Sequence, residues 1–289
     1  MAWLIIIISL IVLWVASLCK FFCGSFHDAK AAFLDDGRVF GRNVLLVIAH
    51  PDDESMFFTP TINYLTLRGH DLYILCLSTG NTANRPVLKF SNFIAFRKPE
   101  RDADGMGSIR KEELFLASAI LKIPHQQVKI LDHPDLQDGF GKVWDWNLIA
   151  GFVEDEICTR AIDSIITFDH YGVSGHCNHR DVGRGVQKLL HDFSERPLEA
   201  WELVSKSIFR KYSGPVDIWL SKLFALFFDS RHLQCLLNED PSKTYAAMAQ
   251  HRSQWIWVVL VGWKDGLRFR KLFVSFSSYT YVNTLKRIH

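Results

Sequence analysis

The residues best suited to chemistry follow an apolar run near the start of the chain. Residues 44–49 are all apolar, and HPDDE at positions 50–54 then places one imidazole and three carboxylates within five positions. Acids crowded at the end of a buried strand repel one another unless a cation neutralises them. The stretch therefore predicts a divalent metal site. A turn in which Asp52 or Asp53 caps the following helix is the alternative interpretation.

A second polar cluster follows the apolar run at residues 164–168. DHYGVSGHCNHR at positions 169–180 contains three histidines and two glycines. If both runs are strands of one parallel sheet, their carboxyl ends lie at the same edge and the clusters can meet. His50, one acid of the first turn and one histidine of the second would then supply three nitrogen or oxygen ligands, the donor set of catalytic zinc.

The elements that must position these clusters alternate along the chain. Apolar, β-branched runs predict buried strands, and helical segments lie between them. The expected strands are 44–49, 72–77, 128–131 and 164–168, and the expected helices are 57–67, 108–121 with Ser108 as N-cap, and 143–162. This order predicts a Rossmann-like α/β fold, with a mainly parallel sheet and helices on both faces. No GxGxxG follows the first strand, so the turn is not predicted to bind a dinucleotide.

Composition narrows the possible partners. The chain of 289 residues has a formal net charge of +2, which gives no bulk attraction toward nucleic acid. Its six cysteines are scattered, without the spacing of a disulfide scaffold or a paired zinc-knuckle pattern. We expect them to be mostly reduced thiols.

The N-terminal segment is strongly apolar. Residues 2–18 carry no charge. A cleavable signal peptide would have a basic start and small residues before its cleavage site, but this segment starts at once with Trp3 and runs into Phe21 and Phe22, so we expect one uncleaved transmembrane helix. Basic residues follow it, which predicts that the rest of the chain faces the cytosol. We expect an anchor at 1–24, a juxtamembrane linker at 25–42 and one α/β domain at 43–289 with an irregular insertion at 82–102.

Five stretches in this order resemble one family. They are IAHPDDESMFF from position 48, ADGMGSIRKEEL from 103, LDHPDLQDG from 131, TFDHYGVSGHCNH from 167 and HRSQ from 251. Together they resemble the N-acetylglucosaminyl-phosphatidylinositol de-N-acetylases of the wider LmbE-like zinc deacetylase family. The resemblance runs from about residue 43 to the C-terminus, and it also includes the single N-terminal anchor.

The resemblance implies roles for the residues of the two clusters. His50, Asp53 and His179 match the metal ligands, for Zn²⁺ or another divalent ion, and Asp52 matches the general base. His176 matches a second histidine, which in its protonated form would stabilise the oxyanion that develops on the carbonyl. Either Asp52 or His176 would return a proton to the leaving amine.

Four further residues are candidates for binding substrate. Arg110 resembles the family's arginine in the helix after the second strand, where a guanidinium can bind hydroxyls or phosphate, and a solvated helix residue is the alternative. Asp135 and Asp138 follow the third strand and could accept hydrogen bonds from sugar hydroxyls, or simply form turns. His251 of HRSQ is the weakest of the four.

The chain also departs from the family pattern. The insertion at 82–102 carries phenylalanines and basic residues at the expected catalytic edge, so it could be a lid, a membrane-surface segment or a loop that damages the site. The apolar run at 255–263 opens a second irregular segment, 255–268. It is too short to span a bilayer and is expected to form a strand or a membrane-facing patch.

The expected activity follows from the resemblance. It is hydrolysis of the acetamide of a phosphatidylinositol-linked N-acetylglucosamine, an early step of glycosylphosphatidylinositol anchor synthesis on the cytosolic face of the endoplasmic reticulum. The alternatives are a zinc deacetylase of another amino sugar and a catalytically impaired, membrane-anchored interaction subunit.

Overall fold

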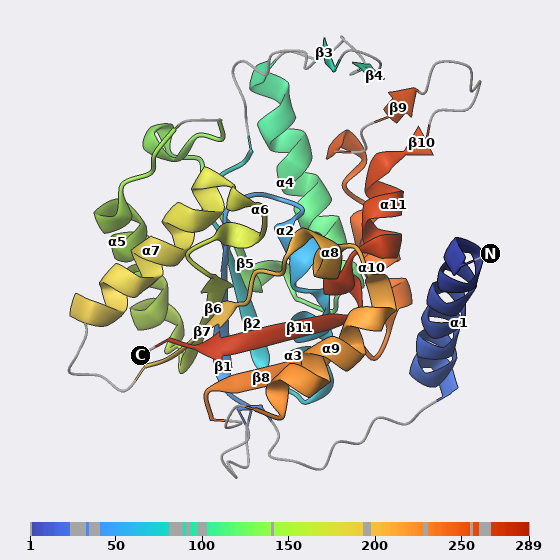
Figure 1. Ribbon diagram of the computed structural model, residues 1–289. Coiled ribbons are helices and arrows are strands. Elements are labelled where there is room, and N and C mark those ends of the chain that lie inside the picture. The colour runs from blue at the N-terminus through green and yellow to red at the C-terminus, as the bar shows by residue number, and fades with distance from the viewer. Residues whose placement is uncertain are drawn as a thin grey trace.

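A seven-stranded sheet forms the centre of the molecule in the computed structural model (Figure 1). The structure describes residues 2–23, 33–34, 41–80, 89–90, 93–96, 103–139, 142–192, 198–227, 231–254, 257–259 and 267–288. The strand order is β5-β2-β1-β6-β7-β11-β8. The strands are β1 (Asn43–Ile48), β2 (Asp71–Cys76), β5 (Val128–Ile130), β6 (Ser164–Phe168), β7 (Glu199–Leu203), β8 (Leu233–Leu237) and β11 (Val282–Arg287).

The sheet is mainly parallel, as predicted. The neighbours from β5 through β7 pair in parallel, whereas β11 is antiparallel to both β7 and β8. Every residue of β6 is buried, and so is every residue of β1 after Asn43, which explains why these strands read as continuous apolar runs. Chain order reverses between β1 and β6, so the edge after these two strands is the expected place for a ligand.

Helices cover both faces of this sheet. The helices α5 and α7 lie on one face, and α3 and α4 lie on the other (Figure 1). The helices are α1 (Ala2–Cys23), α2 (Asp53–Phe57), α3 (Thr59–Leu67), α4 (Ala103–Ile120), α5 (Trp146–Arg160), α6 (Gly172–Gly175), α7 (Cys177–Asp192), α8 (Ile208–Lys211), α9 (Asp217–Ala225), α10 (Pro241–Met248) and α11 (Phe269–Phe276). Short 3-10 helices connect them: η1 (His125–Gln127), η2 (Pro134–Leu136), η3 (Gly214–Val216), η4 (Arg252–Gln254) and η5 (Ser278–Thr280).

Some predicted helix boundaries were wrong. The helix expected at 57–67 is interrupted at Phe58, because Pro60 lies in the first turn of α3, where a missing N–H is tolerated. Ser108 lies inside α4, which begins five residues earlier, so it is not an N-cap. The helix expected from 143 starts after Asp145, whose side chain accepts a hydrogen bond from the Asn147 N–H at 2.9 Å.

The two segments that depart from the family pattern pair with each other. The strands β3 (Lys89–Phe90), β4 (Phe93–Phe96), β9 (Trp257–Val259) and β10 (Leu267–Arg268) form a second, antiparallel sheet in the order β10-β9-β4-β3. The strand expected in 255–263 is therefore present over three residues. The remaining insertion residues, 82–88, 91–92 and 97–102, lie outside the described residues, and so do 255–256 and 260–266 of the second segment.

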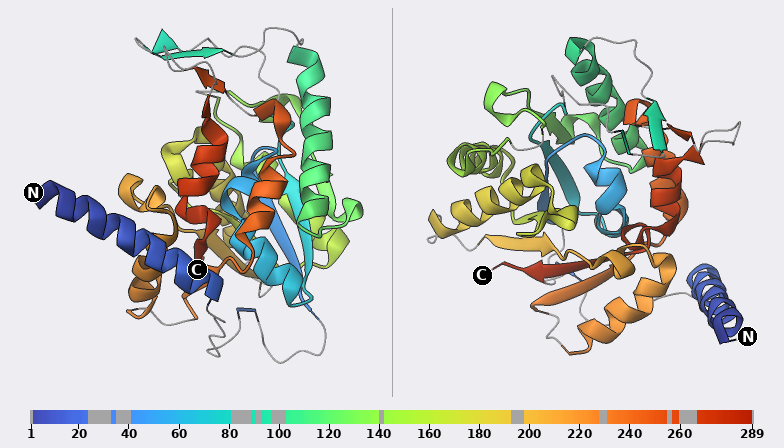
Figure 2. Two further views of the ribbon diagram at one scale, coloured as in Figure 1. Left: turned by 90° about the vertical axis from the view of Figure 1, so that its right-hand side faces the viewer. Right: turned by 45° about the horizontal axis from the view of Figure 1, so that its top comes forward.

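The N-terminal helix α1 lies at the periphery, beside α9 and α11 (Figure 2). Trp219 Nε1 on α9 donates a hydrogen bond to Ser17 Oγ at 2.9 Å, and the rings of Trp14 and Phe276 are 6.4 Å apart. Most of the other apolar side chains of α1 are exposed, Trp3 by 79%. Within the described part of the chain, no helix combines the length and the apolar character needed to cross a membrane.

Candidate metal and catalytic centre

The HPDDE turn is shaped around the carboxylate of Asp53. Asp53 Oδ2 accepts hydrogen bonds from the backbone N–H groups of Ala49 and His50, at 3.1 and 2.9 Å. Asp52 precedes α2 with a positive φ of 120°, and its side chain makes no capping hydrogen bond. Helix capping by Asp52 is therefore wrong, and Asp53, the other candidate cap, is the first residue of α2 itself. The turn instead holds Asp53 Oδ2 in place through two backbone N–H groups, and Oδ1 is left to contact other residues.

The second oxygen of Asp53 meets the second cluster. Asp53 Oδ1 lies 3.2 Å from His179 Nε2, and ligand atoms of His50, Asp53 and His179 all lie within 4.8 Å of one another. All three residues are buried. The structure thus brings together the three predicted metal ligands, from two turns more than 120 residues apart in the chain.

The charges of Asp53 and His179 stabilise each other, as the shifts in their pKa values show. Burial raises the pKa of Asp53, but His179 and His50 outweigh burial and hold this pKa well below its ordinary value. Burial likewise lowers the pKa of His179, but Asp53 more than compensates and raises it overall. These shifts show that the surroundings stabilise the negative charge of the Asp53 carboxylate through nearby positive charge. A divalent cation bound here would supply that positive charge.

The orientation of His179 is fixed by its surroundings. Its Nδ1 lies 3.2 Å from the Gly172 carbonyl oxygen, so an N–H there leaves Nε2 as the free ligand atom. Its ring stacks on Phe168, with centroids 4.2 Å apart and planes at 5°. Gly183 allows α7 to approach β6 this closely, because a Cβ there would lie 2.6 Å from the Phe168 carbonyl oxygen.

This donor set fits a zinc ion. Two imidazoles and one carboxylate are the ligands of many catalytic zinc sites, with further positions left for water and substrate. The Gly172 carbonyl and the two backbone N–H groups on Asp53 are the kind of outer contacts that hold metal ligands in place.

A second possible ligand group shares His50. Atoms of His50, Asp138 and His176 also lie within 4.8 Å of one another. Asp138 Oδ1 lies 3.4 Å from His50 Nε2, so a residue predicted to contact sugar is positioned beside the metal ligands. Burial, with help from His179 and His50, lowers the pKa of His176 to about 4. His176 is therefore neutral near pH 7, where it can accept a proton, and the protonated form expected from the resemblance is disfavoured.

Arg110 is a buried part of the same centre. Its Nη1 donates to the Gly80 carbonyl at 2.6 Å and its Nη2 to the Pro51 carbonyl at 3.1 Å. Nη1 also lies 3.8 Å from Asp138 Oδ2. Arg110 thus joins the end of β2 to the HPDDE turn and is not a solvated helix residue. A direct contact with substrate stays a prediction.

His251 lies behind the HPDDE turn. Its Nε2 donates to Glu54 Oε1 at 2.6 Å, and neither side chain is exposed. Glu54 Oε2 accepts from the Asp52 N–H at 3.0 Å. Ser253 of the same HRSQ stretch is held by Glu113 on α4 through its N–H and its hydroxyl, at 2.6 and 2.5 Å. These contacts support the turn from behind, and a contact of the buried His251 with substrate stays a prediction.

Asp135 and Asn178 differ most from expectation. The Asp135 side chain is 75% exposed and lies 3.8 Å from His133 Nδ1, apart from the buried cluster. The sequence motifs predict no role for Asn178, yet this residue is fully buried and its Nδ2 lies 3.0 Å from His50 Nε2. Its position between His176 and His179 in the second cluster was the available signal.

Solved structures share this fold at low sequence identity. N,N'-diacetylchitobiose deacetylase from Pyrococcus horikoshii has a TM-score of 0.51 at 13% identity, and covers 86% of this chain and 84% of its own. The 4-carboxy-2-hydroxymuconate hydratase GalB from Pseudomonas putida has a TM-score of 0.54 at 13% identity, covering 86% and 96%. Because one is a deacetylase and the other a hydratase, the shared fold does not select the reaction.

Closer relatives are found by sequence. A probable N-acetylglucosaminyl-phosphatidylinositol de-N-acetylase of Dictyostelium discoideum is 30% identical over 282 residues, covering 88% of this chain and 96% of the relative. The N-acetylglucosaminyl-phosphatidylinositol de-N-acetylase of Bos taurus is 32% identical over 246 residues, covering 85% and 83%. The PIG-L family model, described as GlcNAc-PI de-N-acetylase, matches residues 45–190, which span β1 to α7 and both polar clusters. The chain belongs to the PIG-L family, as its motifs predicted.

Proposed function

We propose that this chain is a metal-dependent deacetylase that hydrolyses the acetamide of N-acetylglucosaminyl-phosphatidylinositol. The products would be acetate and glucosaminyl-phosphatidylinositol, as in an early step of glycosylphosphatidylinositol anchor synthesis. The observation that carries the proposal is the buried group of His50, Asp53 and His179 with Asp52 beside it, at the carboxyl edge of β1 and β6. Family membership and the names of the relatives support the deacetylase activity and the substrate.

Zinc is the proposed metal. Bound by His50, Asp53 and His179, it would polarise the acetamide carbonyl and make a water molecule easier to deprotonate. Asp52 is suited to accept the proton of that water, because its backbone is fixed by Glu54 and its carboxylate is not used for capping. The C–N bond would then break, and the amine would leave with the proton that Asp52 took from the water, passed on by Asp52 itself or through the neutral His176.

A membrane setting is part of the proposal. We place the chain at the endoplasmic reticulum, attached through residues 1–24, with the domain from residue 43 on the cytosolic side. Exposed apolar side chains on α1 support attachment, and so does a neighbouring exposed patch on α8, α9 and the turn after α9. The patch consists of Ile208, Phe209, Leu220, Leu223, Leu226 and Phe227.

Membrane attachment can be tested separately from catalysis. We expect the full-length chain to float with membranes, and a form lacking residues 1–24 to shift largely to the soluble fraction. Extraction with alkaline carbonate distinguishes a spanning anchor, which stays in the pellet, from attachment at the interface. Recovery of the full-length chain in the soluble fraction would contradict the proposed setting.

The test of the activity is acetate release. Full-length protein in detergent should release acetate from N-acetylglucosaminyl-phosphatidylinositol, and Asp52→Asn should lower the rate about 10²- to 10⁴-fold, the usual contribution of a general base. Metal analysis should find zinc in both proteins. Equal rates would show that Asp52 is not the base. Activity confined to soluble N-acetylglucosaminides would indicate another amino sugar, and a protein without bound metal or activity would be an interaction subunit.

A further inference from the structure

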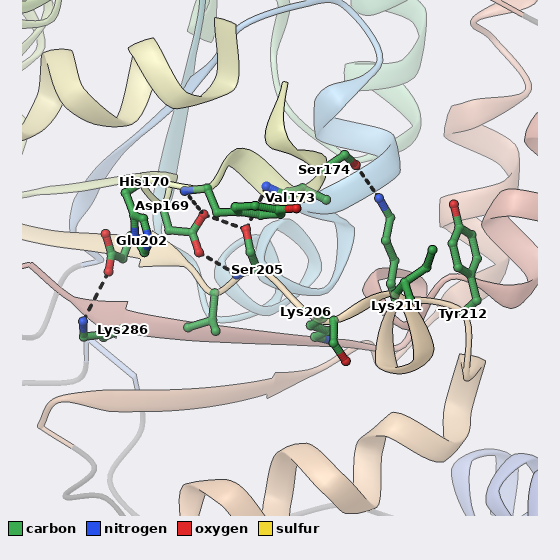
Figure 3. Close-up of a pocket in the computed structure, with 14 residues that line it drawn as sticks. Asp169, His170, Val173, Ser174, Glu202, Ser205, Lys206, Lys211, Tyr212 and Lys286 are labelled. Carbon is green, nitrogen blue, oxygen red and sulfur yellow. Dashed lines mark hydrogen bonds and ion pairs between the residues drawn. The ribbon is translucent and has the colours of Figure 1, made fainter. Parts of the chain in front are cut away.

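A cavity of about 660 Å³ lies beside the metal centre, next to α6 (Figure 3). Its walls come from the segment after β6, from the segment 202–212 that runs from β7 into α8, and from Lys286 on β11. None of the predicted metal ligands or catalytic residues lines it. The cavity is therefore distinct from the site described above, although α6 contributes to both.

Lys211 is the unusual residue of this cavity. The residue is only 8% exposed, and its Nζ donates to Ser174 Oγ; Figure 3 shows the two side chains pointing toward each other. Among the described residues, no carboxylate lies within ion-pair distance of this ammonium. Its other neighbours are the rings of Tyr212 and Phe273, 5.8 and 5.6 Å from Nζ. A largely buried ammonium without an anionic partner is costly in free energy, and binding of an anionic ligand would lower that cost.

The other charges of the cavity wall are already paired. Lys206 Nζ lies 2.9 Å from Asp217 Oδ2, and Lys286 Nζ lies 3.6 Å from Glu202 Oε1. Asp169 accepts hydrogen bonds from Ser205 N–H and Ser205 Oγ, at 2.7 and 2.6 Å. It also accepts from the backbone N–H groups of Tyr171 and Gly172 at the start of α6, at 3.1 and 2.9 Å. Lys211 is thus the one lysine of the described wall whose charge is not balanced.

The helix α6 connects this cavity to the metal centre. Gly172 at its start contacts His179 through its carbonyl oxygen, and Ser174 two residues later contacts Lys211. Two Cα steps span about 7.6 Å at most, so the residues that make the two contacts belong to one short stretch of chain.

The helix α8, which carries Lys211, also carries exposed apolar side chains. Ile208 and Phe209, on α8 with Lys211, are 67% and 87% exposed. The cavity is therefore lined both by α6, which contacts the predicted metal ligand His179, and by α8, whose exposed side chains suit contact with lipid. An amphipathic ligand with a sugar at one end, acyl chains at the other and an anion between them matches this order.

We propose that this cavity binds a phosphodiester group through Lys211 and Ser174. The inference rests on the proposed function: in that reaction the group is the phosphate that joins inositol to the lipid, and its binding orients the acetamide toward the metal centre. A free phosphate ion shares the same chemistry, so the experiment separates the two sources.

The first test compares two substrates in the full-length protein. Lys211→Gln should lower kcat/KM at least tenfold for N-acetylglucosaminyl-phosphatidylinositol, mainly through KM, and less than twofold for N-acetylglucosaminyl-inositol without phosphate. Lys211→Arg should recover part of the loss. As a control, Lys188→Gln removes an exposed lysine of α7 that pairs with Asp192 at 2.8 Å. It should leave kcat/KM unchanged for both substrates. An equal loss on both substrates, or no loss on either, would overturn the proposal.

A binding experiment keeps the inference separate from the proposed function. If the wild type releases no acetate from either substrate, the proposed function fails, and the cavity is tested by calorimetric titration with glycerophosphoinositol and with inorganic phosphate. Binding of glycerophosphoinositol by the wild type and by Lys188→Gln but not by Lys211→Gln supports the lipid headgroup. Equal affinity for both probes would assign the cavity to free phosphate, and it would overturn the claim that the cavity binds the phosphodiester of the lipid. No binding of either probe, or equal binding by a correctly folded Lys211→Gln, overturns the whole proposal.

Discussion

Asp53 and Glu54 are adjacent acids that each pair with a distant histidine, and the two pairs differ in almost everything else. Asp53 Oδ1 lies 3.2 Å from His179 Nε2, and His50 completes a group of ligand atoms within 4.8 Å. Glu54 Oε1 lies 2.6 Å from His251 Nε2, and its second oxygen is taken by the Asp52 N–H. The Asp53 pair belongs to a possible metal site, whereas both oxygens of Glu54 are already used in contacts within the protein.

The difference teaches that residue type does not decide which pair does chemistry. Both pairs consist of a carboxylate and an imidazole, and both are buried. What separates them is whether a third donor converges on the same point and whether the acid has an oxygen left for a ligand. By this criterion we infer that the Asp53–His179 pair is the functional one and that the Glu54–His251 pair holds the turn that presents it.

Removing the histidine of the first pair should have the largest effect. We expect His179→Ala to lose stoichiometric zinc and to lower deacetylase activity by about 10³-fold or more, because the metal contributes several kcal/mol to the transition state. His191→Ala on the same helix removes a side chain that is 89% exposed, and should leave zinc content and rate unchanged. Zinc content by mass spectrometry and acetate release measure both. Retention of zinc and rate by His179→Ala would refute its role as a ligand.

Removing the histidine of the second pair should cost stability. His251→Ala leaves the Glu54 carboxylate buried without its cation, and breaking a buried pair in this way typically costs about 3–5 kcal/mol of unfolding free energy. Zinc per folded molecule should stay near the wild-type value. Denaturant titration and metal analysis of the folded fraction check this, with His191→Ala again as the matched histidine. Loss of zinc without loss of stability would reverse the roles of the two pairs.

The second pair should also contribute a pH dependence. Burial lowers the pKa of His251, but Glu54 outweighs burial and raises it above the ordinary value of 6.5. The stabilisation is therefore complete below pH 6.5 and is lost as pH rises through the raised pKa, with about 1.4 kcal/mol for each unit of difference. We expect the difference in unfolding free energy between wild type and His251→Gln to shrink from pH 6 to pH 9. A difference that grows with pH would mean that the Glu54 contact does not stabilise the charged imidazole.

The sequence could predict the first pair more readily than the second. HPDDE and the second cluster each end an apolar strand, and strands β1, β2, β5 and β6 were located to within about one residue. The prediction was easiest for β1 and β6, because both faces of these two strands are covered. The Glu54–His251 contact joins residues 197 positions apart, and His251 follows no apolar strand that would place it at the catalytic edge.

Buried polar residues explain part of what was missed in the fold. Asn283 is the second residue of β11, where its Oδ1 accepts from Thr61 Oγ1 at 2.7 Å and its Nδ2 donates to the Phe57 carbonyl at 2.8 Å. A fully buried asparagine interrupts the apolar pattern that identifies a strand. The antiparallel strand β11 therefore escaped prediction, although it pairs with two neighbours.

The smallest expected effect lies outside both pairs, at Asp135. Sequence placed Asp135 and Asp138 together as possible sugar contacts, but Asp138 lies 3.4 Å from His50 Nε2 whereas the Asp135 side chain is 75% exposed beside His133. Asp135→Asn keeps the size of the side chain and removes an exposed charge, so we expect kcat/KM within twofold of wild type and a change in unfolding free energy within about 0.5 kcal/mol. Asp138→Asn, measured beside it, should lower kcat/KM at least tenfold, because its carboxylate contacts both a ligand histidine and Arg110. If Asp135→Asn instead raised KM tenfold while leaving zinc content unchanged, the substrate would extend over η2, and the sugar site would reach beyond the buried cluster that the two acid–histidine pairs define.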